Sequence, residues 1–205
     1  MITNNLYVIA AICGNFWRES TVNPGVWENL TVGDPGFGLG QWTDLPQYGL
    51  TRRTQLFNWL TANGYAQDSG IGQLNYLLYE NYWTPNSAGH TSAYSTLSDF
   101  VQSTSTNLTD LTLEYMYHWE GINDPNYQIR LDYASRFLNL FQNDPGYRMP
   151  WSTGNFFNSA TQADFNALLI MDFFLGEEPP PAPIDWRLLY AAAKKKRKER
   201  GWHIV

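Results

Sequence analysis

The chain has 205 residues, enough for one domain with a real core and an additional segment. Hydrophobic residues make up 43% and charged residues 16%, which is typical of a globular protein and excludes a disordered chain. A net charge of −6 argues against a general nucleic-acid binder, a single cysteine excludes an internal disulfide, and the 3 scattered histidines lack metal-ligand spacing, so we expect no metal and no cofactor.

The first predicted helix runs from about residue 5 to residue 18, where apolar residues recur at spacings of three and four. Asn4 or Asn5 can cap its start. The turn sequence Asn23-Pro24-Gly25 marks the point beyond which the helix cannot continue. We therefore expect Glu19 at the C-terminus of this helix or just past it, beside irregular chain.

The segment from residue 21 to residue 50 is rich in glycine and proline, which predicts loops and a short hairpin near residues 37–42. Hydrophobic periodicity then predicts further helices. Their expected ranges are 52–62, 71–83, 98–102, 109–119 and 127–141. The predicted fold class is therefore mainly α, with a glycine-rich loop or short β-hairpin as an insertion.

The composition changes after residue 150. We predict a helical domain over residues 1–150 and a C-terminal extension over residues 151–205. The extension begins with an apolar helix near 161–175, which is too short to span a membrane and contains Asp172. A stiff proline-rich linker follows at 176–184, and then a basic tail. The tail is either a solvated end or a docking element for an acidic partner or nucleic acid.

Two segments carry the candidate chemistry, Arg18–Pro24 and Gly36–Trp42. A glutamate that ends an apolar helix is expected to be partly buried, and burial disfavours the charged form of a carboxyl group. A carboxylic acid that stays protonated near neutral pH can protonate a glycosidic oxygen. Glycines let backbone approach a sugar ring closely. Gln41 can hold the glutamate or an acetamido group, and Trp42 can offer a ring face.

The spacing of these segments resembles a known signature. Glu19-Ser20, followed about twenty residues later by Gly38-Leu39-Gly40-Gln41, resembles the signature of goose-type lysozymes and soluble lytic transglycosylases. The runs AAICGNFWRESTVNPGVWE and GFGLGQWT are more closely similar to the phage tail lysozyme family, which comprises lysozyme-like domains of tail-tip proteins. A distal stretch around Trp119-Glu120 and Arg130 is similar to that family's later helices, so that the resemblance covers about residues 4–142.

The resemblance implies a lysozyme-like fold and cleavage of peptidoglycan glycan strands, by a muramidase or a lytic transglycosylase reaction. It implies that Glu19 is the catalytic acid. The residues that match the rest of the signature are expected to bind substrate: Ser20, Gly38, Gly40, Gln41 and Trp42.

A second catalytic carboxylate is not fixed by the motifs. A retaining glycosidase needs a partner at about 5 Å and an inverting one at about 6.5–9.5 Å, whereas a transglycosylase of this type needs none. Among the nearby acids we rank Asp34 first, Asp44 second and Glu28 third. Glu120 is interpreted instead as a structural partner of Arg130.

The resemblance also implies a location and partners. We expect a virion tail-tip protein, made in the host cytoplasm without a signal peptide, that opens the cell wall locally during infection. Its expected partners are peptidoglycan and, through residues 176–205, other tail proteins. We expect no membrane span and no nucleic acid, except at the basic tail.

Two other interpretations remain. A degenerate lysozyme fold would act as a structural plug of the tail tip without turnover. A cysteine-dependent amide hydrolase of the wall would need Cys13 exposed beside a histidine, but the apolar sequence around Cys13 favours a core position.

Overall fold

A computed structural model describes residues 2–28 and 35–143, together with residues 166–167, 170–171 and 174. In these residues the fold is mainly helical, as the sequence predicted, and contains six α-helices and two small two-stranded hairpins. Asp34, the proline-rich linker and the basic tail lie outside the described residues.

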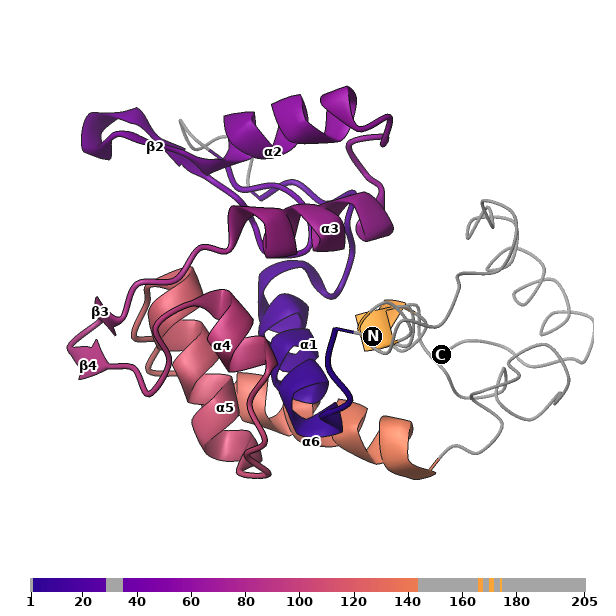
Figure 1. Cartoon of the computed structure of the whole chain (residues 1–205), viewed down its shortest axis with the longest axis vertical. Helices are drawn as coiled ribbons and strands as arrows, with labels where there is room; N and C mark the ends of the chain where they lie inside the picture. Colours follow the sequence, from indigo (N-terminus) through magenta and orange to yellow (C-terminus); the bar gives the residue numbers. More distant parts are fainter. Residues whose placement is uncertain (1, 29–34, 144–165, 168–169, 172–173, 175–205) are drawn as a thin grey trace, which may run out of the picture.

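Helix α1 (Leu6–Ser20) forms the centre of the domain (Figure 1). The side chain of Asn5 caps its start by accepting a hydrogen bond of 3.0 Å from the backbone N–H of Tyr7. Every residue from Val8 to Phe16 is buried, as expected for a helix that is apolar on all sides. Near its C-terminal end Trp17, Arg18 and Glu19 are partly or fully exposed, so that the last turn brings Glu19 to the surface.

Two helical segments pack against α1. Helix α5 (Leu108–Tyr115) is continued by a π-helix at Met116–Glu120, and helix α6 (Gln128–Asn143) follows. The approach of α6 to α1 is close at Gly14, where an added Cβ would lie 2.6 Å from the carbonyl oxygen of Arg130 and 2.7 Å from the Cβ of Ala134. The absence of a side chain at Gly14 thus sets how α6, and Arg130 with it, lies against α1.

Replacing Gly14 with alanine should destabilise the domain, although alanine favours a helix by about 1 kcal/mol. The added methyl group meets backbone that cannot move aside, and overpacking of this kind costs about 1–3 kcal/mol. Urea unfolding of the variant would measure the loss. Gly25→Ala is the matched control, because its Cβ would meet neighbours only at 3.4 Å and beyond. Equal stability of the two variants would contradict the close packing of α1 on α6.

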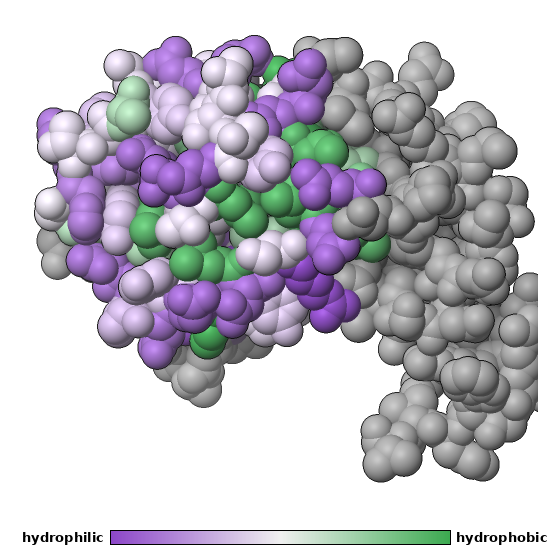
Figure 2. Space-filling view, turned by 90° about the horizontal axis from the view of Figure 1, so that it is seen from below, coloured by the Kyte–Doolittle hydropathy of each residue, from purple (hydrophilic) through white to green (hydrophobic). Residues whose placement is uncertain are grey.

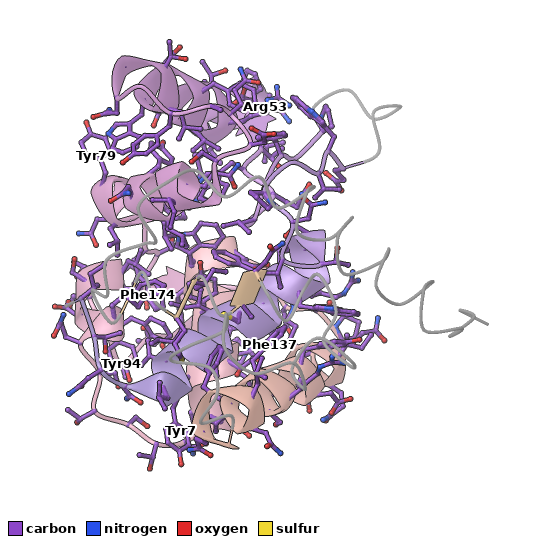
Figure 3. The ribbon with its side chains drawn as sticks, turned by 90° about the vertical axis from the view of Figure 1, so that its right-hand side faces the viewer. Tyr7, Arg53, Tyr79, Tyr94, Phe137 and Phe174 are labelled. Carbon is purple, nitrogen blue, oxygen red and sulfur yellow. The ribbon has the colours of Figure 1, made fainter. Side chains whose placement is uncertain are left out.

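Helices α2 (Arg52–Ala62) and α3 (Gly70–Glu80) form a second layer above α1 (Figure 1). Ser69 caps the start of α3, and Asn81 adopts a left-handed conformation (φ 46°) that ends the helix. The helix therefore stops at Glu80, three residues before the predicted end at residue 83. In Figure 3, Tyr79 lies at the outer edge of this layer and Arg53 lies at its other end.

Two short hairpins lie before α2 and after α3 in the chain. Strands β1 (Asp44–Leu45) and β2 (Leu50–Thr51) pair antiparallel around a 3₁₀ turn at Pro46–Tyr48. Strands β3 (Asn86–Ser87) and β4 (His90–Thr91) form a second hairpin, which periodicity did not predict because each strand has only 2 residues. Helix α4 (Leu97–Val101) follows it.

Part of the C-terminal extension belongs to the same core. The described residues of the predicted helix near 161–175 are helical. Four of them are buried: Ala167, Ile170, Met171 and Phe174. The backbone N–H groups of Ile2 and Thr3 donate to the carbonyl of Phe174 at 2.8 and 3.1 Å, so this segment is fixed against the start of the chain. Figure 3 shows Phe174 and Phe137 on either side of α1.

The underside of the molecule, formed in part by α6, presents a patch of apolar residues with hydrophilic residues around it (Figure 2). Leu138 and Leu140 of α6 are only partly buried, whereas Ile129, near the start of that helix, is exposed. None of the helices within the described ranges is both long and apolar enough to cross a membrane.

Candidate functional site

The candidate site is built around Glu19 in the last turn of α1. Its carboxyl group contacts Arg130 of α6, with 2.5 Å between Oε1 of Glu19 and Nη2 of Arg130. The Glu19 side chain is 22% exposed, whereas that of Arg130 is 1% exposed. One face of the Glu19 carboxyl group is therefore open to solvent or a ligand, and its other face is held from inside.

Arg130 organises the groups behind Glu19. Its Nη1 donates to Oδ1 of Asn15 and to Oε2 of Glu120, each at 3.0 Å. Asp124 lies farther from the guanidinium, at 3.9 Å, and pairs with the exposed Arg18 at 3.5 Å. A planar guanidinium with several donors is suited to holding more than one carboxyl group in fixed positions.

Glu120 is the inner carboxyl group of this cluster. It ends the π-helix, after which Gly121 turns the chain away with φ 75°. Its side chain is only 5% exposed. Burial raises the pKa of Glu120 well above its ordinary range, and the negative charge of Glu19 raises it further against the opposing effect of Arg130. A π-helical turn is rare and is often found at functional sites.

The segment Gly38-Leu39-Gly40 is clamped beside the end of α1. The backbone N–H of Leu39 donates to Oε1 of Gln73 at 2.9 Å, and its carbonyl lies 2.8 Å from Oγ of Ser20. Ser20 and Gln73 are both buried. Ser20 and Leu39 therefore tie the two motifs of the signature directly to each other.

Two of the glycines in this segment are required by close contacts. Gly38 has φ 78°, and an added Cβ there would overlap Gln73. An added Cβ at Gly40 would overlap the ring of Trp119 and lie 3.2 Å from Phe16. These glycines let the loop approach the core, so their observed role is in packing.

The side chains of Gln41 and Trp42 make hydrogen bonds within the protein. The side-chain amide of Gln41 donates to the carbonyl of Gly38 at 2.9 Å, and no bond from Gln41 to Glu19 is seen among the described residues. Trp42 is 1% exposed, and its indole N–H donates to Glu80 at 3.1 Å. In this structure Trp42 therefore has no ring face open to a sugar.

Of the three ranked candidates for a second carboxylate, Asp44 is fully engaged in structural contacts. It accepts hydrogen bonds from the backbone N–H and the hydroxyl of Thr54, at 3.0 and 2.7 Å, and pairs with Arg53 at 3.1 Å. Burial alone would raise the pKa of Asp44, but the hydrogen bonds from Thr54 and the charge of Arg53 together lower it. Asp44 thus anchors the first turn of α2 as a carboxylate.

Asp44→Asn should destabilise the fold by about 1.5–3 kcal/mol at neutral pH, since it removes hydrogen bonds to a charged group. Because the folded-state pKa is lowered, this contribution is present above the ordinary aspartate pKa of about 3.9 and is lost as the pH falls through the lower value. Unfolding measured from pH 7 to pH 2 should show the variant and the wild type converging. The exposed Asp132→Asn is the control, and an equal loss there would contradict this role.

The other two candidates, Glu28 and Asp34, follow α1 in the sequence. The carboxyl group of Glu28 accepts from the backbone N–H of Gly36 at 3.0 Å, and the Glu28 N–H donates to the carbonyl of Gly36 at 2.9 Å. These bonds close the base of the segment that contains Asp34. Asp34 itself lies outside the described residues.

The structure joins residues that the sequence left apart. The Glu120–Arg130 pair is confirmed, but sequence analysis missed that Arg130 also holds Glu19. It also missed Gln73, whose two bonds besides Leu39 go to the carbonyls of Pro24 and Gln67, at 2.7 and 2.8 Å. In the sequence, the signal for this role of Gln73 is a glutamine on the helix face that carries the apolar residues of α3.

Neither a cysteine nucleophile nor a metal site is supported by the described part of the chain. Cys13 is completely buried, and burial raises the pKa of its thiol, so that it is a poor nucleophile. No group of three or more His, Cys, Asp or Glu side chains is arranged to hold a metal ion in the ranges that the structure covers.

Comparison with known proteins agrees with this geometry. Residues 5–141 match the family described as phage tail lysozyme. The chain is 32% identical over 120 residues to morphogenesis protein 1 of Bacillus phage B103, an alignment that covers 58% of this chain and 30% of that protein. The chain thus corresponds to less than a third of the length of this relative.

Proposed function

Since the chain belongs to the phage tail lysozyme family, we propose that it cleaves the glycan strands of peptidoglycan with Glu19 as the general acid. The observation that carries the proposal is the position of the Glu19 carboxyl group, which is partly exposed at the end of a buried helix and held from inside by Arg130. A general acid must be both positioned and accessible to the leaving oxygen.

A loop linked to the end of α1 by the pair of Arg18 and Asp124 offers side chains suited to a glycan. The loop from Gly121 to Tyr127 follows Glu120 and exposes the side chains of Ile122 and Tyr127. Apolar and aromatic side chains of this kind are suited to contact the flat faces of sugar rings. In this proposal Ser20, Gly38, Gly40, Gln41 and Trp42 support the substrate site mainly by holding the loop beside Glu19.

For a hydrolytic reaction we propose Asp34 as the second carboxylate. Support comes from the closed base of its segment, at Glu28 and Gly36, and from the bond between Gly38 N–H and the carbonyl of Val26 at 2.9 Å. Leu39 in turn contacts Ser20, next to Glu19. The described residues on the two sides of the segment that contains Asp34 are therefore linked to each other and to the end of α1.

Mass spectrometry of the products released from purified peptidoglycan tests the proposal. Muropeptides with reducing ends would identify a muramidase, and Asp34→Asn should then lower the rate strongly. Anhydro ends would identify a lytic transglycosylase, for which no second carboxylate is needed. The absence of any product from walls of the correct host would contradict the proposed activity.

One observation favours a second candidate, a structural plug without turnover. The Glu19 carboxyl group is paired with the buried Arg130, a contact that a purely structural residue would also make. If this contact were the only role of Glu19, the domain would keep the fold and lack the acid. The product analysis above decides between the two functions.

The family and the relative's description as a morphogenesis protein support a place in the virion tail, with residues 176–205 as the attachment to other tail proteins. Phe174 is buried in the core, so that a deletion should begin after it. We expect a chain lacking residues 176–205 to keep its activity on isolated wall and to be missing from assembled virions. Incorporation of the shortened chain at wild-type level would contradict this attachment.

A further inference from the structure

The carboxyl groups of Glu19 and Glu120 form a pair behind the proposed cleavage site. Both contact Arg130, Glu19 at Nη2 and Glu120 at Nη1. The two carboxyl groups are therefore brought together on one guanidinium, and burial and then the charge of Glu19 raise the pKa of Glu120. Two carboxylates are both acceptors, so that a hydrogen bond between them requires a proton on one.

The unpaired oxygen of Glu120 points to the same conclusion. Its Oε2 accepts from Arg130, but its Oε1 is buried and meets no donor from the described residues. A buried oxygen that carries charge and has no donor is costly. A proton shared with Glu19 removes this cost, because one carboxyl group then donates to the other.

The acidic and basic side chains of this cluster have a net charge of zero if one of the acids carries a proton. Three acidic groups, Glu19, Glu120 and Asp124, face two basic ones, Arg130 and Arg18. With every acid ionised this set has an excess of one negative charge, although most of it is buried. Within the described ranges, a further titratable neighbour is the buried Tyr115 of α5, whose pKa is raised by burial and then by the charge of Glu120, so that it stays neutral.

We propose that Glu120 is a positioning residue that shares one proton with Glu19 and so supplies Glu19 with the proton that it donates. This inference rests on the proposed function. When the glycosidic C–O bond breaks, the shared proton moves from Glu19 to the leaving oxygen, and both carboxyl groups become carboxylates. The pair regains its proton from the group that attacks the sugar, which is water in hydrolysis or the sugar's own hydroxyl in transglycosylation.

This arrangement accommodates the ion pair with Arg130. Burial and then the charge of Glu19 raise the pKa of Glu120, so that the pair can retain a proton beside Arg130. Because the Glu120 side chain is buried, the shared proton cannot exchange freely with solvent through Glu120. The partly exposed Glu19 is the route by which it reaches the substrate.

A carboxyl ¹³C NMR titration of the full-length protein labelled at glutamate tests the proton directly. We expect one carboxyl pair to retain a proton at pH 6, where an isolated glutamate with a pKa of about 4.3 is almost fully ionised. The late-titrating signal should disappear in both Glu19→Gln and Glu120→Gln. Full ionisation of every glutamate by pH 6 in the wild type would overturn the proposal.

Kinetics separate this role from a merely structural one. In Glu120→Gln the alkaline limb of the kcat/KM profile should move to lower pH by about one unit or more, because the charge that retains the proton is gone. Glu120→Asp restores the charge and should move the limb back, even if its rate is lower. Glu114→Gln, which alters an acid whose carboxyl group accepts a hydrogen bond from Ser92, is the control.

A Glu120→Gln profile that is only scaled down, with its limb unmoved, would overturn the proposal. If Glu120→Gln does not fold, the NMR titration of the wild type and the pH profile of Glu120→Asp still test whether the pair shares a proton. The NMR titration requires no turnover. A protein that holds the shared proton but releases no product would therefore refute the proposed function and leave the proton pair standing.

Discussion

Glu19→Gln should lower the rate of peptidoglycan cleavage by at least about 100-fold, since general acid catalysis contributes about 10²–10⁴-fold. The amide has nearly the same shape and can still accept a hydrogen bond from Arg130, which holds Glu19 at 2.5 Å in the wild type. It has no acidic proton to donate. The release of soluble fragments from purified wall, measured under initial-rate conditions, would report the loss.

The control for this variant is Glu114→Gln, the same chemical change at an acid whose carboxyl group contacts Ser92 and His118. It should cleave at close to the wild-type rate. Circular dichroism and the unfolding midpoint should show that Glu19→Gln remains folded. A folded Glu19→Gln that retains a tenth or more of the wild-type rate would contradict the assignment of Glu19 as the acid.

Arg130→Met should be the most destabilising single change in the site. Removing one partner of a buried ion pair costs about 3–5 kcal/mol, because the remaining charge is left without compensation. Here the guanidinium is 1% exposed and contacts two carboxyl groups, Glu19 and Glu120. Guanidinium or urea unfolding at pH 7 would measure the change in the free energy of unfolding.

Two further variants make this prediction specific. Arg18→Met removes an arginine of the same cluster that is 43% exposed, and exposed ion pairs contribute about 0–1 kcal/mol. Adding Glu120→Gln to Arg130→Met should recover part of the lost stability, since one uncompensated acid is then neutral. If Arg18→Met and Arg130→Met had equal effects, the buried cluster would not have the energetic role assigned to it.

The helices were the most predictable part of the fold, and particular residues explain why. Asn5, the Asn23-Pro24-Gly25 turn and the Asn63-Gly64 pair carry local signals that specify a helix end. The end of α3 was missed because Asn81 takes a left-handed conformation that asparagine adopts only sometimes. The hairpin at 86–91 was missed because 2-residue strands have no periodicity.

The site was less predictable, because its contacts join residues far apart in the chain. Glu19 was identified by its place after an apolar helix and by the signature that follows. Its partner Arg130 is 111 residues away, and sequence spacing alone does not bring the two together. Trp42 illustrates the reverse case, since a tryptophan beside a glycine-rich loop suits a sugar platform, whereas here it fills the core against Trp119.

A crystal structure of Glu19→Gln with a peptidoglycan glycan fragment bound would test the central claim most directly. The account predicts that the side-chain amide of the substituted residue lies within about 2.6–3.2 Å of a glycosidic oxygen, with the sugars extending past Ile122 and Tyr127. A fragment bound elsewhere on the domain, with no glycosidic oxygen near position 19, would contradict it.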